Sequence, residues 1–95
     1  MIDNARLRLS AQRALLGAVS RDVDAIGLRV EGTRILVEVA AGASLDEDAR
    51  EALEVAATEI IADFPEATHI DVRHVASREA FLEGTTLVFL RFAAT

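Results

Sequence analysis

Apolar residues recur along the first part of the chain with the period of an α-helix. Asp3 precedes this segment, which runs from Asn4 to about Leu16, and Gly17 follows it. These are typical positions for an N-cap residue and for the end of a helix. The apolar residues follow the i, i+4, i+7, i+8, i+11 spacing that places side chains on one side of a helix: Leu7, Ala11, Ala14, Leu15 and Ala18. The pattern predicts a first helix with one buried face.

Alternation of apolar and polar residues replaces this period in the next part of the chain. Ala25–Glu31 and Arg34–Ala40 both alternate, and Gly32-Thr33 separates them. Glycine in the first place of a two-residue loop is typical of a II′ turn. The two runs therefore predict an antiparallel hairpin.

The second predicted helix has the most clearly marked start. Ser44 and Glu47 form a capping-box pattern, and acidic residues fill the first turn, where the helix dipole favours negative charge. The apolar stripe continues to Phe64. Because Pro65 disfavours helical geometry in the residue before it, we expect the helix to end near Asp63.

Two more strands are predicted towards the end of the sequence. Thr68–Val75 alternates, whereas Thr85–Phe92 contains the run Leu87–Leu90, which is apolar on both faces. We therefore expect the last strand to be central or covered on both sides. Between them, Ala76–Gly84 fits either a loop or a short helical turn, and Phe81-Leu82 within it either closes an edge of the core or contacts a partner.

The predicted order of elements is α-β-β-α-β-β, which places the protein in the α+β class. The simplest architecture is one four-stranded, mainly antiparallel sheet with two helices packed on one face. The sequence contains no linker, repeat or low-complexity segment. We interpret residues 1–95 as a single domain.

Composition excludes several kinds of chemistry. The 95 residues include no Cys, Trp or Tyr, and the net charge is −6. Disulfides, thiolate metal sites and a Cys nucleophile are therefore excluded, and nonspecific binding to nucleic acid or an anionic membrane is disfavoured. His69 and His74 are five residues apart on a predicted strand, so they point to opposite faces and cannot hold one metal ion. We predict no enzymatic activity, no cofactor and no metal.

The start of the sequence does not resemble a secretory signal. Its longest apolar stretch, Ala14–Val19, is shorter than the roughly 7–15 uninterrupted residues that such a signal needs. No stretch approaches the length of a membrane span. We therefore predict a cytoplasmic location.

Negative charge is concentrated in one part of the chain. Residues 35–71 carry one Arg against ten Asp and Glu, a net charge of −9, whereas residues 1–34 carry +2 and residues 72–95 carry +1. Two interpretations are open. The second helix has a solvated acidic face that Arg6 and Arg13 of the first helix partly neutralise, or it presents a patch that meets a basic partner.

Three segments carry a resemblance to a known family. They are Gln12–Gly17, Ala57–Pro65 at the end of the acidic helix that opens with Ser44–Asp48, and Leu87–Arg91. In order and spacing they resemble the small acidic immunity proteins of contact-dependent growth inhibition and related polymorphic toxin systems. The resemblance implies a protein that binds a cognate toxin domain and covers its active site or displaces its substrate.

Toxin domains of this kind are often nucleases with basic clefts, so the resemblance also implies a basic partner. An acidic helix can then imitate the charge of phosphate groups. The expected contacts lie in the first half of the second helix: Asp46, Glu47, Asp48, Glu51 and Glu54.

A second hypothesis comes from the order of the elements. It resembles ferredoxin-like domains, which often pair through sheet edges. The alternative is therefore a small self-associating regulatory or accessory module without catalytic activity, which forms a homodimer.

Overall fold

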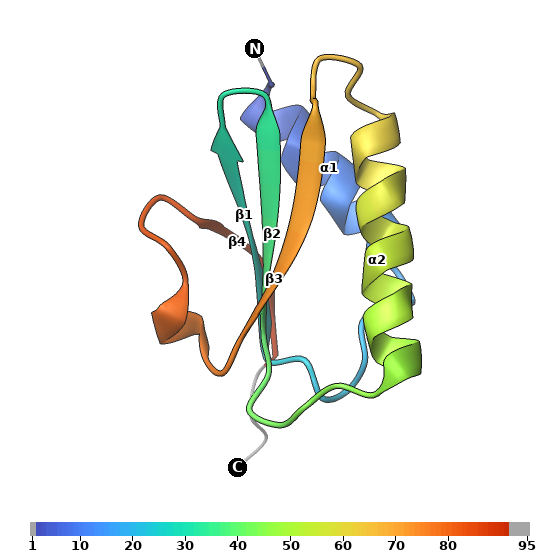
Figure 1. Cartoon of the computed structure of the whole chain (residues 1–95), viewed down its shortest axis with the longest axis vertical. Helices are drawn as coiled ribbons and strands as arrows, with labels where there is room; N and C mark the ends of the chain where they lie inside the picture. The colour runs from blue at the N-terminus through green and yellow to red at the C-terminus, as the bar shows by residue number, and fades with distance from the viewer. Residues whose placement is uncertain (1, 92–95) are drawn as a thin grey trace.

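A four-stranded sheet with two helices on one face forms the protein, as a computed structural model shows for residues 2–91 (Figure 1). The predicted α+β class and element order are confirmed. A single turn of 3-10 helix, Arg78–Ala80, follows the third strand. The other elements are α1 (Asn4–Ala14), β1 (Ala25–Glu31), β2 (Arg34–Ala40), α2 (Glu47–Ala62), β3 (His69–Val75) and β4 (Thr86–Leu90).

The sheet has the strand order β3-β2-β1-β4. β1 pairs antiparallel with both β2 and β4, whereas β2 and β3 run parallel. The parallel pair arises because α2 connects β2 to β3 and returns the chain to the end of the sheet where β2 began. The sheet is therefore mixed and mainly antiparallel, as predicted.

The hairpin between β1 and β2 has the predicted turn. Glu31 pairs with Arg34, which leaves Gly32 and Thr33 as the two loop residues. Gly32 has φ +63°, and Thr33 does not have a positive φ. A II′ turn needs a positive φ only at its first central residue, so glycine is required at this one position.

The helix ends agree with the sequence at three of four points. Asp3 caps α1 by accepting the Ala5 N–H at 2.8 Å, and α2 ends at its C-cap Asp63. Gly17 has φ +75° in the turn that follows α1. The predicted capping box at the start of α2 is wrong, because the Asp46 carboxylate, rather than the Ser44 hydroxyl, caps the helix and accepts the Ala49 N–H at 2.8 Å.

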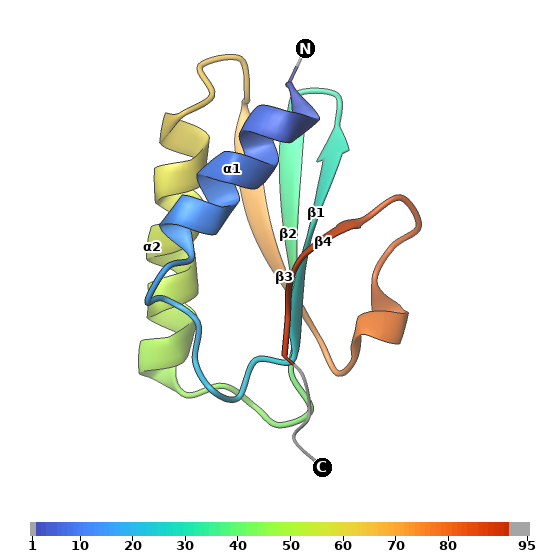
Figure 2. The ribbon, with the colours of Figure 1, turned by 180° about the vertical axis from the view of Figure 1, so that it is seen from behind.

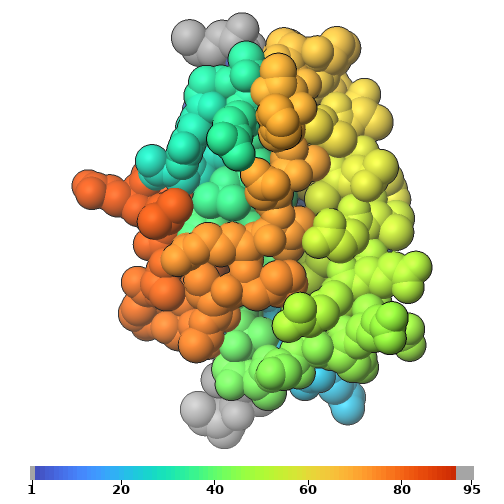
Figure 3. Space-filling model, viewed as in Figure 1, coloured from blue at the N-terminus to red at the C-terminus, as the bar shows by residue number. Residues whose placement is uncertain are grey.

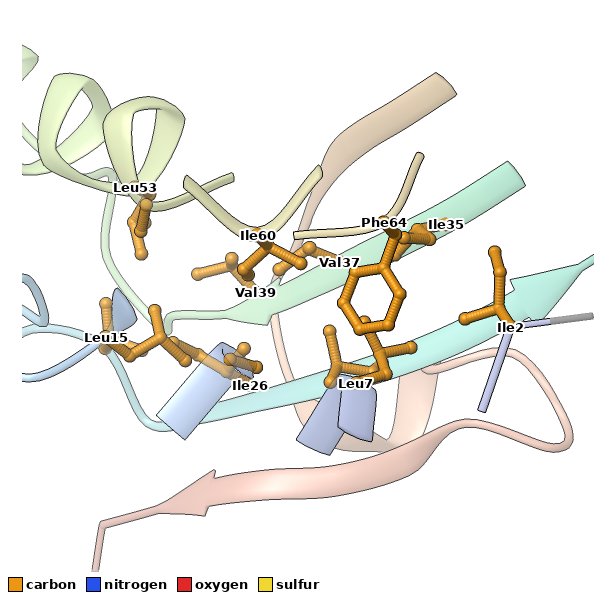
Figure 4. Close-up of a cluster of buried hydrophobic side chains, with 14 of the residues drawn as sticks. Ile2, Leu7, Leu15, Ile26, Ile35, Val37, Val39, Leu53, Ile60 and Phe64 are labelled. Carbon is orange, nitrogen blue, oxygen red and sulfur yellow. The ribbon is translucent and has the colours of Figure 1, made fainter. Parts of the chain in front are cut away.

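The core lies between the sheet and the two helices (Figure 4). Each strand of the hairpin contributes alternate residues, and each helix contributes the stripe that its spacing predicted. Burial of each large side chain stabilises the fold by about 1.5–3 kcal/mol relative to exposure. The labelled members in Figure 4 are Ile2, Leu7, Leu15, Ile26, Ile35, Val37, Val39, Leu53, Ile60 and Phe64.

β4 is an edge strand with exposed apolar side chains, so the prediction of a strand that is central or covered on both sides is wrong. Val88 and Phe89 pack against the core, whereas Leu87 and Leu90 are 40% and 37% exposed. An apolar run shows that both faces of a strand can meet apolar surface, but it does not show whether both edges are paired. Phe92, the predicted last residue of this strand, lies outside the described residues.

The segment between β3 and β4, residues 76–85, lies over the face of the sheet opposite the helices (Figure 3). Glu38 of β2 is fully buried beneath it. The Glu38 carboxylate accepts hydrogen bonds from Arg73 Nη1 at 2.7 Å, from the Leu82 N–H at 3.1 Å and from the Thr85 hydroxyl. One buried carboxylate therefore joins this loop to the sheet.

Phe81 covers part of the same face, next to Gly27 of β1. A Cβ atom at Gly27 would lie 3.2 Å from Phe81 Cε2 and would collide with the Thr85 methyl group. Gly27 therefore allows the loop to approach the sheet closely. Phe81 is half-buried against the sheet, and Leu82 is exposed.

Candidate functional site

α2 has one side in the core and one side in solvent. Leu53, Ala56, Ala57 and Ile60 are buried against the sheet. The five predicted contact residues are all exposed: Asp46, Glu47, Asp48, Glu51 and Glu54. The helical period thus separates the residues that stabilise the fold from those available to a partner.

The five carboxylates do not form a single cluster. Asp46 is the N-cap, and its carboxylate bonds to the helix it precedes. Glu54 lies towards β3, where its charge acts on His74. Glu47 lies one turn before Glu51 on the exposed side, as its spacing of four residues requires.

Asp48 and Glu51 line a groove of about 420 Å³ between α2 and the turn after α1. We call it the α1–α2 groove. Leu16 and Val55 face it, although they are 80% and 51% exposed. Glu59 also lines it, although this residue was not among the five predicted contacts. Its spacing of i+8 from Glu51 was the available signal, but the position of α1 was needed to show which side of α2 meets the groove.

Within the described residues, no ion pair joins α1 to the acidic side of α2. Arg6 was expected to help neutralise them, but it lies at the other end of the helix. There its Nη2 donates to the Asp63 carbonyl oxygen at 3.3 Å, and its guanidinium lies 5.0 Å from the Phe64 ring centroid. Figure 2 shows α1 running diagonally across the sheet, with its C-terminal end next to α2. Within residues 2–91, the ion pairs involve none of the five predicted acids: Arg29–Glu31, Arg34–Asp71 and Arg73–Glu38.

His74 lies beside this surface, on the helix-facing side of β3 opposite Val39. Desolvation by burial, and then the positive charge of Arg50, lower the pKa of His74 below its ordinary value of 6.5, while Glu54 acts in the opposite direction. The neutral imidazole is therefore favoured in the folded state at neutral pH. His74 does not offset the negative charge of α2 there.

The lowered pKa of His74 predicts a pH dependence of stability. Above the unfolded pKa near 6.5 the imidazole is neutral in both states, so its titration does not reduce the free energy of unfolding. As the pH falls below 6.5 the unfolded state binds the proton first, and the free energy of unfolding decreases until the folded state is also protonated. We expect His74→Gln to lose this decrease. Urea unfolding of both proteins at neutral and mildly acidic pH measures it, with His69→Gln as the matched histidine control. Parallel pH profiles for wild type and His74→Gln would contradict the prediction.

Residues 2–91 contain neither a metal-binding cluster nor a membrane-spanning helix. Within residues 2–91, no group of three or more His, Asp and Glu side chains is arranged to hold a metal ion. Over the same residues, no helix is both long and apolar enough to cross a membrane. The fold and the α1–α2 groove thus describe a small α+β protein whose prominent feature is a partly apolar surface bordered by carboxylates.

Comparison with known proteins identifies the family. The family model of the MafI2 immunity protein matches residues 4–93, so the chain belongs to this family. No curated protein matches the sequence. The resemblance to small immunity proteins of polymorphic toxin systems is confirmed, and the family supports an immunity function directed against a cognate toxin.

Proposed function

We propose that this protein neutralises a basic toxin domain by binding it through the exposed acidic side of α2. Family membership supports a toxin as the partner. The side chains Asp46, Glu47, Asp48, Glu51 and Glu54 support the choice of surface, because all five are exposed and none is in an ion pair within the described residues. Complementary charge would increase the association rate and favour the correct partner.

The net charge of the surface also supports a nuclease as the toxin. A nuclease cleft must attract phosphate groups, so it carries positive charge. Glu47 and Glu51 are one helical turn apart and present two carboxylates to solvent in one row. Such a row would occupy the cleft in place of the nucleic acid backbone and would exclude the substrate. Immunity of this kind needs no catalytic step.

Growth rescue tests the function directly. A toxin domain encoded next to the gene for this protein is produced in a bacterial host, with and without this protein. We expect the toxin alone to stop growth and the pair to grow, and we expect the purified pair to form a complex in calorimetry. Continued growth arrest together with the absence of a complex would overturn the proposed function.

Charge reversal tests the surface. We expect Glu47→Lys/Glu51→Lys to weaken toxin binding about tenfold or more, mainly through a slower association rate, because electrostatic steering is reversed. The matched control is Glu79→Lys/Glu83→Lys, which changes two exposed acids on the opposite face of the sheet by the same total charge. Association rates measured at low and high salt distinguish the two double variants. Equal weakening by both pairs would assign the effect to net charge rather than to α2.

Self-association is a second candidate, and the edge strand β4 favours it. Thr86–Leu90 contains no charged residue and no proline, the features that usually protect an exposed edge, and Leu87 and Leu90 are exposed. We propose antiparallel pairing of β4 with β4 of a second copy. α2 packs along β3, at the other edge of the sheet, so the two acidic surfaces would remain apart.

Sedimentation at high micromolar concentration tests this pairing. We expect a wild-type dimer and a monomeric Leu87→Lys variant, because pairing of the two β4 strands would bring like-charged lysines together. Leu9→Lys changes an exposed leucine on α1, away from β4, and is expected to remain dimeric. A monomeric wild-type protein would contradict self-association and would leave toxin binding unaffected.

A further inference from the structure

The α1–α2 groove has an apolar centre that electrostatic attraction alone does not explain. We propose that this groove receives a large apolar side chain carried on a basic segment of the toxin. The inference rests on the proposed function and extends it from a charged surface to a defined pocket. The occupant is thus an Arg- or Lys-rich segment with one leucine-like or aromatic side chain at its centre.

The exposure of Leu16 is the first feature that supports this pocket. This residue is 80% exposed, the highest exposure among the large apolar side chains in the described part of the chain. It lies in the turn after α1, immediately before Gly17, which has a φ of +75°. The position of Leu16 is therefore determined by the backbone rather than by packing of its side chain, which leaves the side chain free to contact a partner.

The position of Val55 is the second feature that supports the pocket. This residue faces the same groove from α2 and is 51% exposed. A single exposed leucine or valine is ordinary on a protein surface, but two that face one groove from different helices form a shared apolar contact. Small side chains complete the lining between them: Ala14, Ala18, Ala52 and Ala56. The groove is therefore hollow where an inserted side chain would lie.

The border of the groove determines the chemistry of the partner. Asp48, Glu51 and Glu59 border it from α2, against a single cation, Arg13, from α1. No ion pair within residues 2–91 involves these three acids. An apolar centre surrounded by unpaired carboxylates complements a segment that carries an apolar residue between basic ones. Protein interfaces commonly have this arrangement of an apolar anchor inside a polar rim.

A second hollow lies on the other side of Leu16, towards β4. Leu16 also borders this hollow of about 330 Å³, which Val88 and Phe89 line from β4. Leu16 thus forms the ridge between two hollows. A segment bound in the α1–α2 groove would contact one side of Leu16. We expect toxin binding to be more sensitive to substitution of Leu16 than of any other groove residue.

Leu16→Asp separates the apolar contribution from the electrostatic one. The added carboxylate is attracted to a basic toxin, so a loss of binding does not come from weaker charge complementarity. It comes from the lost apolar contact and from desolvation of the new carboxylate in the groove. We expect about a 100-fold loss of affinity for the neighbouring toxin domain, and loss of growth rescue, as for a central interface residue. Leu9→Asp is the matched control, because it adds the same charge at another exposed leucine outside the groove. Thermal melts should show both variants folded, since both side chains are largely in solvent.

Three outcomes distinguish the possibilities. Loss of binding by Leu16→Asp and retained binding by Leu9→Asp would support the pocket. Wild-type rescue together with equal, undiminished binding by both variants would overturn the pocket while toxin neutralisation still holds. Failure of the wild-type protein to bind or rescue would overturn both. Val55→Ala provides a second variant from the other helix, with an expected loss of about tenfold.

Discussion

Replacement of Glu38 by alanine is expected to destabilise the protein by about 3 kcal/mol, with a fall in Tm on the order of 15 °C. Glu38 is fully buried, and its carboxylate is the common acceptor for Arg73, the Leu82 N–H and the Thr85 hydroxyl. Its removal takes the acceptor away from the Leu82 N–H and the Thr85 hydroxyl, which both belong to the loop, whereas Arg73 Nη1 still donates to the Ala80 carbonyl oxygen at 3.2 Å. It also releases residues 76–85 from the face of the sheet.

A graded series tests this role. Glu38→Gln preserves the shape and an acceptor oxygen but loses the charge that pairs with Arg73, so we expect a loss intermediate between wild type and Glu38→Ala. Glu83→Gln removes a charge from an exposed glutamate in the same loop and is expected to be neutral. Urea unfolding measures all three. A Glu38→Ala protein as stable as Glu83→Gln would show that the buried carboxylate does not hold the loop.

Gly27→Ala is expected to destabilise by about 2 kcal/mol, because a Cβ atom there collides with Thr85 and lies 3.2 Å from Phe81 Cε2. The sign of the change in stability distinguishes this collision from the ordinary effect of replacing glycine. In an ordinary strand, alanine is more stable than glycine by about 0.5–1 kcal/mol, since glycine has more backbone freedom to lose on folding.

Gly42→Ala is the matched control for this change. The nearest neighbour of a Cβ atom at Gly42 is Asp24 Oδ2 at 3.7 Å, which is ordinary contact, and φ there is not positive. We expect unchanged or slightly higher stability for this variant. If denaturant unfolding showed Gly27→Ala to be as stable as Gly42→Ala, the close approach of the loop at Gly27 would not be a constraint on the fold.

Local sequence patterns predicted much of the fold. The bounds of Ala25–Glu31 and Arg34–Ala40 agree with the structure because alternation and a glycine-first turn both act within a few residues. The start of α2 was placed wrongly because Ser44 and Asp46 both have capping side chains, and the pattern alone did not decide between them. The edge position of β4 was missed because pairing with β1 is a long-range property.

The candidate site was predictable only in part. The acidic half of α2 follows from composition and helical spacing, and its exposure is as expected. The groove is different, since it forms where the turn after α1 passes Val55 and Glu59. Leu16 was placed in the first helix as its last residue, with no indication that it would be the most exposed of the large apolar side chains described. Glu38 gave no signal either, because a polar residue in an alternating strand normally faces water.

The division of α2 into a buried and a solvent-facing side has a consequence for divergence among related immunity proteins. Substitutions on the solvent-facing side, at Glu47, Glu51 or Val55, change no core contact and are expected to alter stability by no more than about 0.5 kcal/mol each. The surface proposed for recognition can therefore change residue by residue while Leu53, Ala56 and Ile60 maintain the same scaffold. A lineage could acquire protection against a new toxin without passing through an unfolded intermediate sequence.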